Sequence, residues 1–203
     1  MLPLILLAAS ILPAPQIIVT CVDTGATVAT ARTQPAGGPG GLTAVLEVTS
    51  SDDYSKHSHQ CTAQYRLAIV SAASAGPQVI DLLTSDADYG RSLSLSLGGF
   101  SKDGKRVLGV LSEGGKDPFT TLFDYHAGDG SVQLVDLAKP FRGVLAAGCS
   151  PRYDAIGATS SGAIVLELHS PKPCSSNGRW LLDSAGGKPR RPPPGEPILG
   201  LSH

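Results

Sequence analysis

The chain has 203 residues, of which 41% are hydrophobic and only 16% are charged, and its formal net charge at pH 7 is −1. This length is enough for one domain with a substantial core, and the near-neutral charge excludes the basic footprint of a nucleic-acid-binding protein. The 24 glycines and 16 prolines favour many turns and short elements, and therefore an all-β fold over an all-α fold.

Residues 1–16 have the features of a secretory signal peptide, because an apolar run is followed by small residues and prolines. No Lys or Arg precedes the run, so a buried N-terminal strand is the alternative. The run is too short for a membrane-spanning helix. We therefore expect an exported protein, periplasmic or extracellular, with no membrane span.

Four cysteines follow, and an even number in an exported chain favours disulfides. They are Cys21, Cys61, Cys149 and Cys174. We expect Cys21 to pair with Cys61, and Cys149 with Cys174, because each pair closes the shorter loop within one half of the chain. Four buried thiols, or a lipid on Cys21 at a poorly matching processing site, are the alternatives. No CxxC motif is present, so cysteine-based zinc or thioredoxin chemistry has no support.

Apolar runs and apolar–polar alternation predict strands along the whole chain, separated by segments rich in Gly, Pro, Ser and Asp. In the first half we expect strands at residues 17–22, 26–31, 42–48, 61–70 and 78–83, with a polar loop at 50–60. In the second half we expect them at residues 91–97, 105–111, 120–125, 131–137, 155–159, 163–168 and 179–182, with a further strand from Val144. Residues 188–197 are too rich in proline for the centre of a sheet, so we expect a mobile tail there, with residues 198–201 as an edge strand or part of that tail.

The segment FSKDGKRVLGVL at residues 100–111 indicates the end of one strand, a tight turn and a new strand. Gly104 can adopt the positive φ that such a turn requires. A segment with similar organisation, from Val144 to Leu182, follows the first after about forty residues, which is a spacing typical of propeller blades. A looser copy spans residues 42–83 and ends in QVIDLL, much as the first copy ends in VQLVDL.

This repeat resembles that of TolB-like and WD40-like β-propellers, whose blade motif is F-S-P-D-G-K-R with a later strand ending in Asp-Leu. The matching residues of the first copy are Phe100, Ser101, Asp103, Gly104, Lys105 and Arg106, with Lys102 in place of the proline. Ser150 and Pro151 match in the second copy, and the pairs Asp136-Leu137 and Asp81-Leu82 match the blade ends. The resemblance covers about 90 to 140 residues and implies blades, but it says nothing about activity, since propellers of this kind are mostly binding scaffolds.

Three blades are too few for a closed ring of four to eight. Residues 17–31 and 179–201 could share a fourth blade, the sheets could form a smaller open or sandwich-like domain, or half-rings could assemble across a dimer.

The richest cluster of metal-ligating residue types lies in SSDDYSKHSHQC. Two alternating imidazoles and a carboxylate suit zinc or copper, so His57, His59 and Asp53 are candidate metal ligands. A solvated polar loop is the alternative reading of this segment. The DxD of Asp86 and Asp88 is more typical of a turn than of a calcium site.

Motifs for covalent or phosphate chemistry are absent from the sequence, which contains no GxSxG, GxGxxG or GxxxxGK[ST]. We interpret His126 and His169 as surface residues rather than bases, and the low aromatic content of 5% argues against a stacking surface for sugars or bases. We expect no catalytic residue and no cofactor.

The sequence thus predicts an all-β chain of antiparallel four-stranded meanders, propeller-like and small or incomplete, with a β-sandwich as the alternative. We expect a signal peptide at residues 1–16, the β-rich domain at 17–185 and a Pro-rich tail at 186–203. The predicted function is that of an exported, non-catalytic binding or scaffold protein with a protein partner. The alternative is a metal-binding protein or metal-dependent hydrolase that uses His57 and His59.

Overall fold

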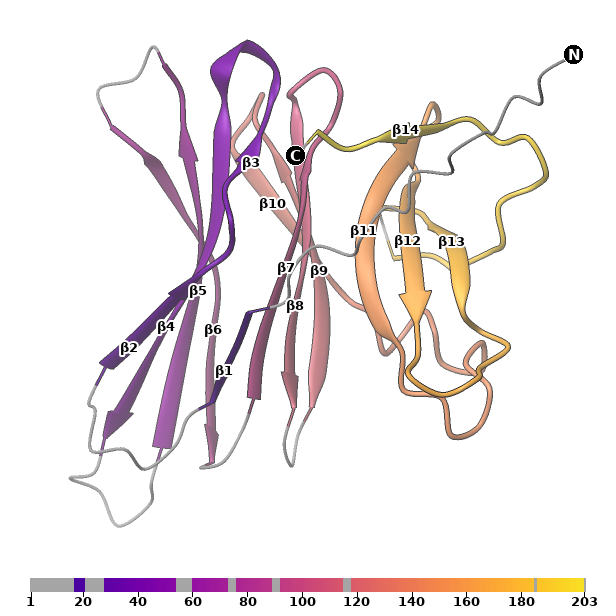
Figure 1. Ribbon diagram of the computed structural model, residues 1–203, viewed down its shortest axis with the longest axis horizontal. Helices are drawn as coiled ribbons and strands as arrows, with labels where there is room; N and C mark the ends of the chain where they lie inside the picture. The colour runs from indigo at the N-terminus through magenta and orange to yellow at the C-terminus, as the bar shows by residue number, and fades with distance from the viewer. Residues whose placement is uncertain are drawn as a thin grey trace, which may run out of the picture.

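The computed structural model describes residues 17–20, 28–53, 60–72, 76–88, 92–114, 118–184 and 186–202. These residues form three antiparallel sheets that stand side by side (Figure 1), joined by turns and one short 3₁₀ helix, η1 (Pro39–Gly41). No α-helix occurs among the described residues. The predicted all-β fold of antiparallel meanders is confirmed.

We name the sheets by their order in the chain. The N-terminal sheet contains β2 (Val28–Arg32), β3 (Ala36–Gly37), β4 (Thr43–Asp53), β5 (Gln60–Val70) and β6 (Gln78–Asp88). The central sheet has the order β1 (Ile17–Thr20), β7 (Ser92–Phe100), β8 (Arg106–Gly114), β9 (Phe119–His126) and β10 (Ser131–Asp136). The C-terminal sheet has the order β13 (Gly178–Leu182), β12 (Ile164–His169), β11 (Arg152–Thr159) and β14 (Ile198–Gly200).

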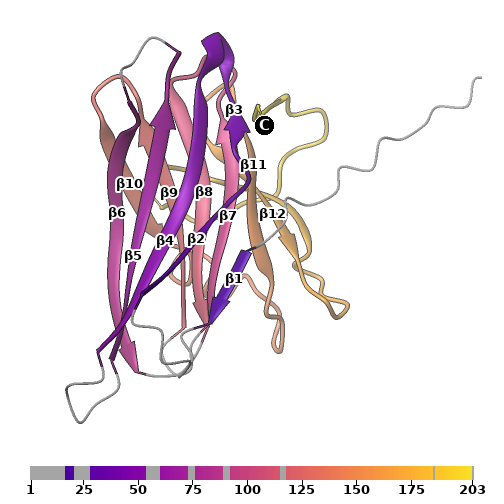
Figure 2. The ribbon, with the colours of Figure 1, turned by 60° about the vertical axis from the view of Figure 1, so that its left-hand side comes forward.

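The central sheet lies between the other two and buries both of its faces (Figures 1 and 2). Val107, Leu111 and Phe123 pack against the N-terminal sheet, whereas Leu108 and Leu122 pack against the C-terminal sheet. Successive side chains of a strand point to opposite faces. A strand covered on both sides therefore needs an apolar residue at nearly every position, which explains the continuous run at residues 107–111.

Strand β7, which lies next to β1 in the central sheet, approaches both β4 and β11. Gly98 lies at an irregularity of β7 between Leu97 and Gly99, and a Cβ atom at Gly98 would overlap the carbonyl oxygen of Ala155 on β11. The absence of a side chain at Gly98 thus allows β7 and β11 of the two sheets to come close at this point.

The described strands do not close a ring. The terminal segments proposed for a shared fourth blade separate instead, because β1 pairs with β7 and β2 pairs with β4, while β13 and β14 belong to the C-terminal sheet. The outward face of the N-terminal sheet carries ion pairs between Arg32 and Glu47 and between Arg66 and Asp81. The stack is therefore an open series of three sheets with a charged outer face.

The Pro-rich C-terminal segment is built into the sheets, which corrects the expectation of a mobile tail. Arg190 exchanges two main-chain hydrogen bonds with Leu181, and the guanidinium of Arg191 lies 4.0 Å from the ring centroid of Trp180. β14 then pairs with β11, and Ser202 pairs with Phe100 of the central sheet. Prolines are tolerated here because the segment runs along sheet edges and its non-proline residues make the hydrogen bonds.

Two other expectations are wrong. The segment from Val144, expected to be a strand, forms a series of turns between β10 and β11. Ser150-Pro151 therefore lies before β11 and not between two strands of a blade, and the turn between β11 and β12 contains Gly162 instead. The polar residues 50–53 belong to β4 rather than to a loop. Sequence patterns undervalue such strand ends, because polar side chains on a solvent face pair across strands, as Thr30 does with Thr49.

Candidate functional site

The turn between β7 and β8 is organised by the side chain of Asp103. Its Oδ1 accepts hydrogen bonds from Ser101 Oγ at 2.7 Å and from the main-chain N–H of Lys105 at 3.1 Å. The Ser101 hydrogen bond is the main cause that lowers the pKa of Asp103. Gly104 has a φ of 72°, the conformation that the Asp-Gly sequence predicts.

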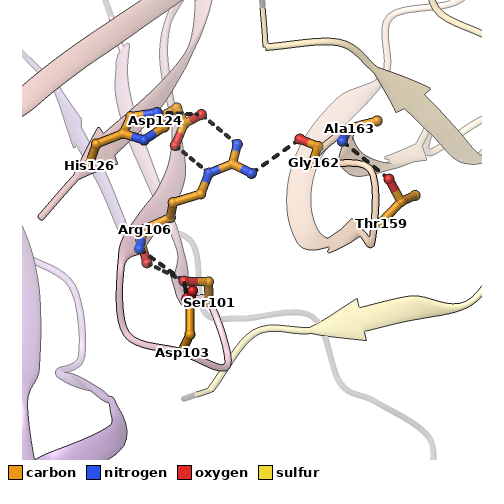
Figure 3. A network of polar contacts seen from close by, with 8 residues as sticks. All are labelled: Ser101, Asp103, Arg106, Asp124, His126, Thr159, Gly162 and Ala163. Atoms are coloured by element: carbon orange, nitrogen blue, oxygen red, sulfur yellow. Dashed lines mark hydrogen bonds and ion pairs between the residues drawn. The ribbon is translucent and has the colours of Figure 1, made fainter. Parts of the chain in front are cut away.

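Arg106, directly after this turn, connects the central and C-terminal sheets (Figure 3). Its Nε and Nη2 donate to the two carboxylate oxygens of Asp124 at 3.0 and 2.5 Å, and its Nη1 donates to the carbonyl oxygen of Gly162 at 3.1 Å. The Asp124 side chain is 1% exposed. A planar guanidinium can serve a bidentate carboxylate and a third acceptor together, so this motif residue has a structural role.

Asp124, His126 and Ser131 lie close together but do not form a nucleophilic triad. His126 Nε2 lies 3.3 Å from Asp124 Oδ2, and His126 is opposite Ser131 in the strand register. However, Ser131 Oγ donates to Asp129 Oδ1 at 2.7 Å, and Arg106 already binds both Asp124 oxygens. A triad needs the hydroxyl on the imidazole and the imidazole on a free carboxylate, and neither condition holds here.

A second polar cluster links the central sheet to the N-terminal sheet. Glu113 is 4% exposed, and its Oε1 accepts a hydrogen bond from Tyr65 at 2.7 Å and another from Ser85. The donors come from β5 and β6, so this carboxylate orients one sheet on the other. Buried carboxylates are costly unless hydrogen bonded, and here the protein supplies the donors.

The predicted metal ligands cannot be assembled from the described part of the chain. His57 and His59 lie outside the described residues, and for Asp53 only the main chain is described, opposite Gln60. Among the described residues, no group of three or more His, Cys, Asp or Glu side chains could hold a metal ion. Metal binding at this segment stays a prediction.

One of the two predicted disulfides is confirmed. Cys149 and Cys174 are bonded, with their Cα atoms 5.9 Å apart. The bond joins the turns after β10 to the loop after β12, where Ser176 Oγ also accepts a hydrogen bond from Ala146 N at 3.0 Å. The other pairing stays a prediction, because Cys21 and the side chain of Cys61 lie outside the described residues.

A pocket of about 150 Å³ opens at one end of the seam between the N-terminal and central sheets. Ile69, Phe100 and Tyr125 contribute buried apolar surface, while Gln78 and Ala127 are exposed residues of its lining. Sequence reasoning missed this pocket, because its walls come from the ends of several strands that are distant in the chain. The only local signal was the glycine turn, since Gly104 is part of the wall.

Comparison with known proteins gives no relative: no family model, no curated protein and no solved structure matches this chain. Among the described residues, no helix is long and apolar enough to cross a membrane. The disulfide is a feature typical of proteins in oxidising compartments.

Proposed function

We propose that this chain is an exported, non-catalytic binding or scaffold protein with a propeller-like architecture and a protein partner. The polar contacts between the sheets support this proposal, because the motif residue Arg106 and the carboxylates of Asp124 and Glu113 hold sheets together and are engaged by neighbouring protein groups. The signal-like segment at residues 1–16 and the disulfide support export.

The observation that carries the proposal is that the N-terminal and central sheets each end in an unpaired edge strand on the same side of the seam between them (Figure 2). β6 and β10 end their sheets, and no described strand pairs with their outer edges. Figure 2 shows both strands on the same side of the molecule. On these two strands, Leu134 is 40% exposed, and Ile80, Leu83 and Val132 are only partly buried. An open edge offers main-chain groups to an added strand, and adjacent apolar side chains give such a contact specificity.

Affinity capture with the immobilised mature protein from a periplasmic or extracellular extract tests the proposal. We expect a protein partner that rebinds in purified form. Because Leu134 offers exposed apolar surface beside this edge, Leu134→Lys should weaken rebinding at least about tenfold. Gln133→Lys is the matched control, because it adds the same charge on the opposite face of β10 and removes no apolar contact, so it should weaken rebinding much less. No partner, equal binding by both variants, measurable turnover, or stoichiometric zinc that is lost in His57→Ala/His59→Ala would overturn the proposal.

A further inference from the structure

Tyr125 is buried in the seam between the N-terminal and central sheets, and its hydroxyl has no hydrogen-bond partner among the described residues. The side chain is only 1% exposed. Tyr65, in the same cluster, is equally buried, but its hydroxyl donates to Glu113. The hydroxyl oxygen itself is not enclosed, because Ser170 Oγ is the one buried side-chain polar atom without a hydrogen bond among the described residues. Tyr125 lines a pocket at this seam, so its hydroxyl can take a hydrogen bond from a group outside the chain, as tyrosine hydroxyls in apolar surroundings ordinarily do.

The pocket lined by Tyr125 has the size and polarity of a site for one small ring. Its volume of about 150 Å³ is close to that of an apolar cavity known to hold benzene, and far below the roughly 300 Å³ at which sites for larger ligands begin. None of its lining residues carries a charged side chain. Ile69 and Phe100 supply apolar surface, so the pocket favours an uncharged, mainly apolar ligand.

The walls of the pocket are held by main-chain structure. Gly104 lines the pocket in a turn conformation with a φ of 72°. Ala127, which also lines the pocket, donates its main-chain N–H to the carbonyl oxygen of Lys105 at 2.8 Å. Two turns of the central sheet are thereby tied together on the side of the pocket. A site held in this way loses little conformational freedom when it is filled.

We propose that this pocket binds a compact, uncharged molecule of benzene size, with one polar substituent that hydrogen bonds to the hydroxyl of Tyr125. Only Gln78 and Ala127 among the lining residues are exposed, so the opening offers little surface to a partner protein, and we assign the site to a free small molecule. This ligand is additional to the protein partner proposed at the open edges of β6 and β10.

Phenol and toluene are suitable probes, because they have nearly the same shape and only phenol has a hydroxyl. Titrations of the isotope-labelled mature protein, followed by the amide signals of Gly104 and Ala127, should show saturable binding of both probes. Tyr125→Phe should weaken phenol about fivefold, as expected for the loss of one net hydrogen bond, and should leave toluene unchanged. Tyr153→Phe is the matched control, because Tyr153 is a buried tyrosine of the other seam, and it should leave both affinities unchanged.

A second variant fills the site without touching a buried residue. Ala127→Phe should abolish binding of both probes, whereas Ala138→Phe, at another exposed turn alanine, should have no effect. The small-molecule proposal falls if the probes shift no pocket amide, if phenol binds Ala127→Phe normally, or if Tyr125→Phe does not change phenol affinity. It also falls if the peptide acetyl-Ala-Tyr-Ala-amide binds more tightly than phenol, because the pocket would then receive a partner side chain. Partner capture at the Leu134 edge is measured separately, so either proposal can fail without the other.

Discussion

Arg106 and Asp124 face each other on neighbouring strands of the central sheet, and the guanidinium holds both carboxylate oxygens while it also binds the Gly162 carbonyl of the next sheet. The pair lies at the edge of the apolar seam between the central and C-terminal sheets. The motif residue with the most extensive contacts is therefore a connection between two layers.

Removal of the Asp124 carboxylate should be strongly destabilising. Asp124→Ala leaves the largely buried guanidinium of Arg106 without its counter-ion, and we expect a loss of about 3 kcal/mol in the free energy of unfolding. Urea denaturation measures this loss. Glu167→Ala is the control, because its ion pair with Arg179 is solvent-exposed and should contribute at most about 1 kcal/mol. Equal losses in the two variants would contradict the structural role of Asp124.

Gly104→Val should also destabilise the fold. The residue has a φ of 72°, and a Cβ atom there would lie 2.8 Å from Pro39 Cγ. Strain and overlap together should cost about 2 kcal/mol or more.

Gly130→Val separates the two causes. Gly130 has a φ of 71°, but no atom of the described residues lies within 4 Å of the position that its Cβ would occupy. Thermal unfolding of both variants should show the larger loss for Gly104→Val. An unchanged melting temperature for Gly104→Val would show that the turn tolerates a side chain.

Loss of the Cys149–Cys174 disulfide should destabilise the C-terminal sheet. The two residues are 25 positions apart, and a bond that closes a loop of this size contributes about 3 kcal/mol. Cys149→Ser/Cys174→Ser should therefore lower the urea midpoint under non-reducing conditions. A variant with an unchanged midpoint would show that the hydrogen bonds of Ser176 suffice to hold these loops.

Stability should decline in alkaline solution because of Tyr153. Burial raises the pKa of Tyr153 to about 12 from its ordinary value of 10.0. The unfolded chain then loses the phenolic proton at lower pH than the folded chain, so the contribution of Tyr153 is fully present below pH 10 and is lost as the pH rises towards 12.

Denaturation at a series of pH values, compared between the wild type and Tyr153→Phe, isolates this contribution. The difference in unfolding free energy between the two proteins should be constant below pH 10 and should then change steadily up to pH 12. A constant difference across that range would contradict the assigned cause.

Much of the local structure could be predicted from the sequence, because strand and turn signals depend on neighbouring residues. The alternating Leu93, Leu95 and Leu97 face the N-terminal sheet as predicted, but the opposite face of this strand is also covered, since Ser96 is buried and hydrogen bonds to Asp154 of β11. The glycine turn has the predicted conformation. The Cys149–Cys174 bond followed from loop length. The strand expected from Val144 is absent. This segment forms turns that are hydrogen bonded to Ser176, and its apolar run has no local feature that distinguishes it from a short strand.

The order of the sheets and the candidate pocket could not be predicted in this way. Residue periodicity shows that Val107 and Leu108 point to opposite faces, but not which sheet covers each face. Similarly, nothing in the local sequence shows that Tyr65 hydrogen bonds to Glu113, or that Tyr125 lines a pocket and has no hydrogen-bond partner among the described residues.

An all-β chain of antiparallel strands, the glycine turn at Gly104 and the disulfide in the second half follow from the amino-acid sequence. The open stacking of the three sheets, the attachment of the Pro-rich segment through Arg190 and Ser202 and the uncharged pocket at one seam are known from the folded structure alone. This difference arises from the distance along the chain over which the responsible interactions act. Turns and alternation arise from steric and solvation preferences within a few residues, whereas sheet partners, buried hydrogen bonds and cavities depend on packing between residues far apart in the chain.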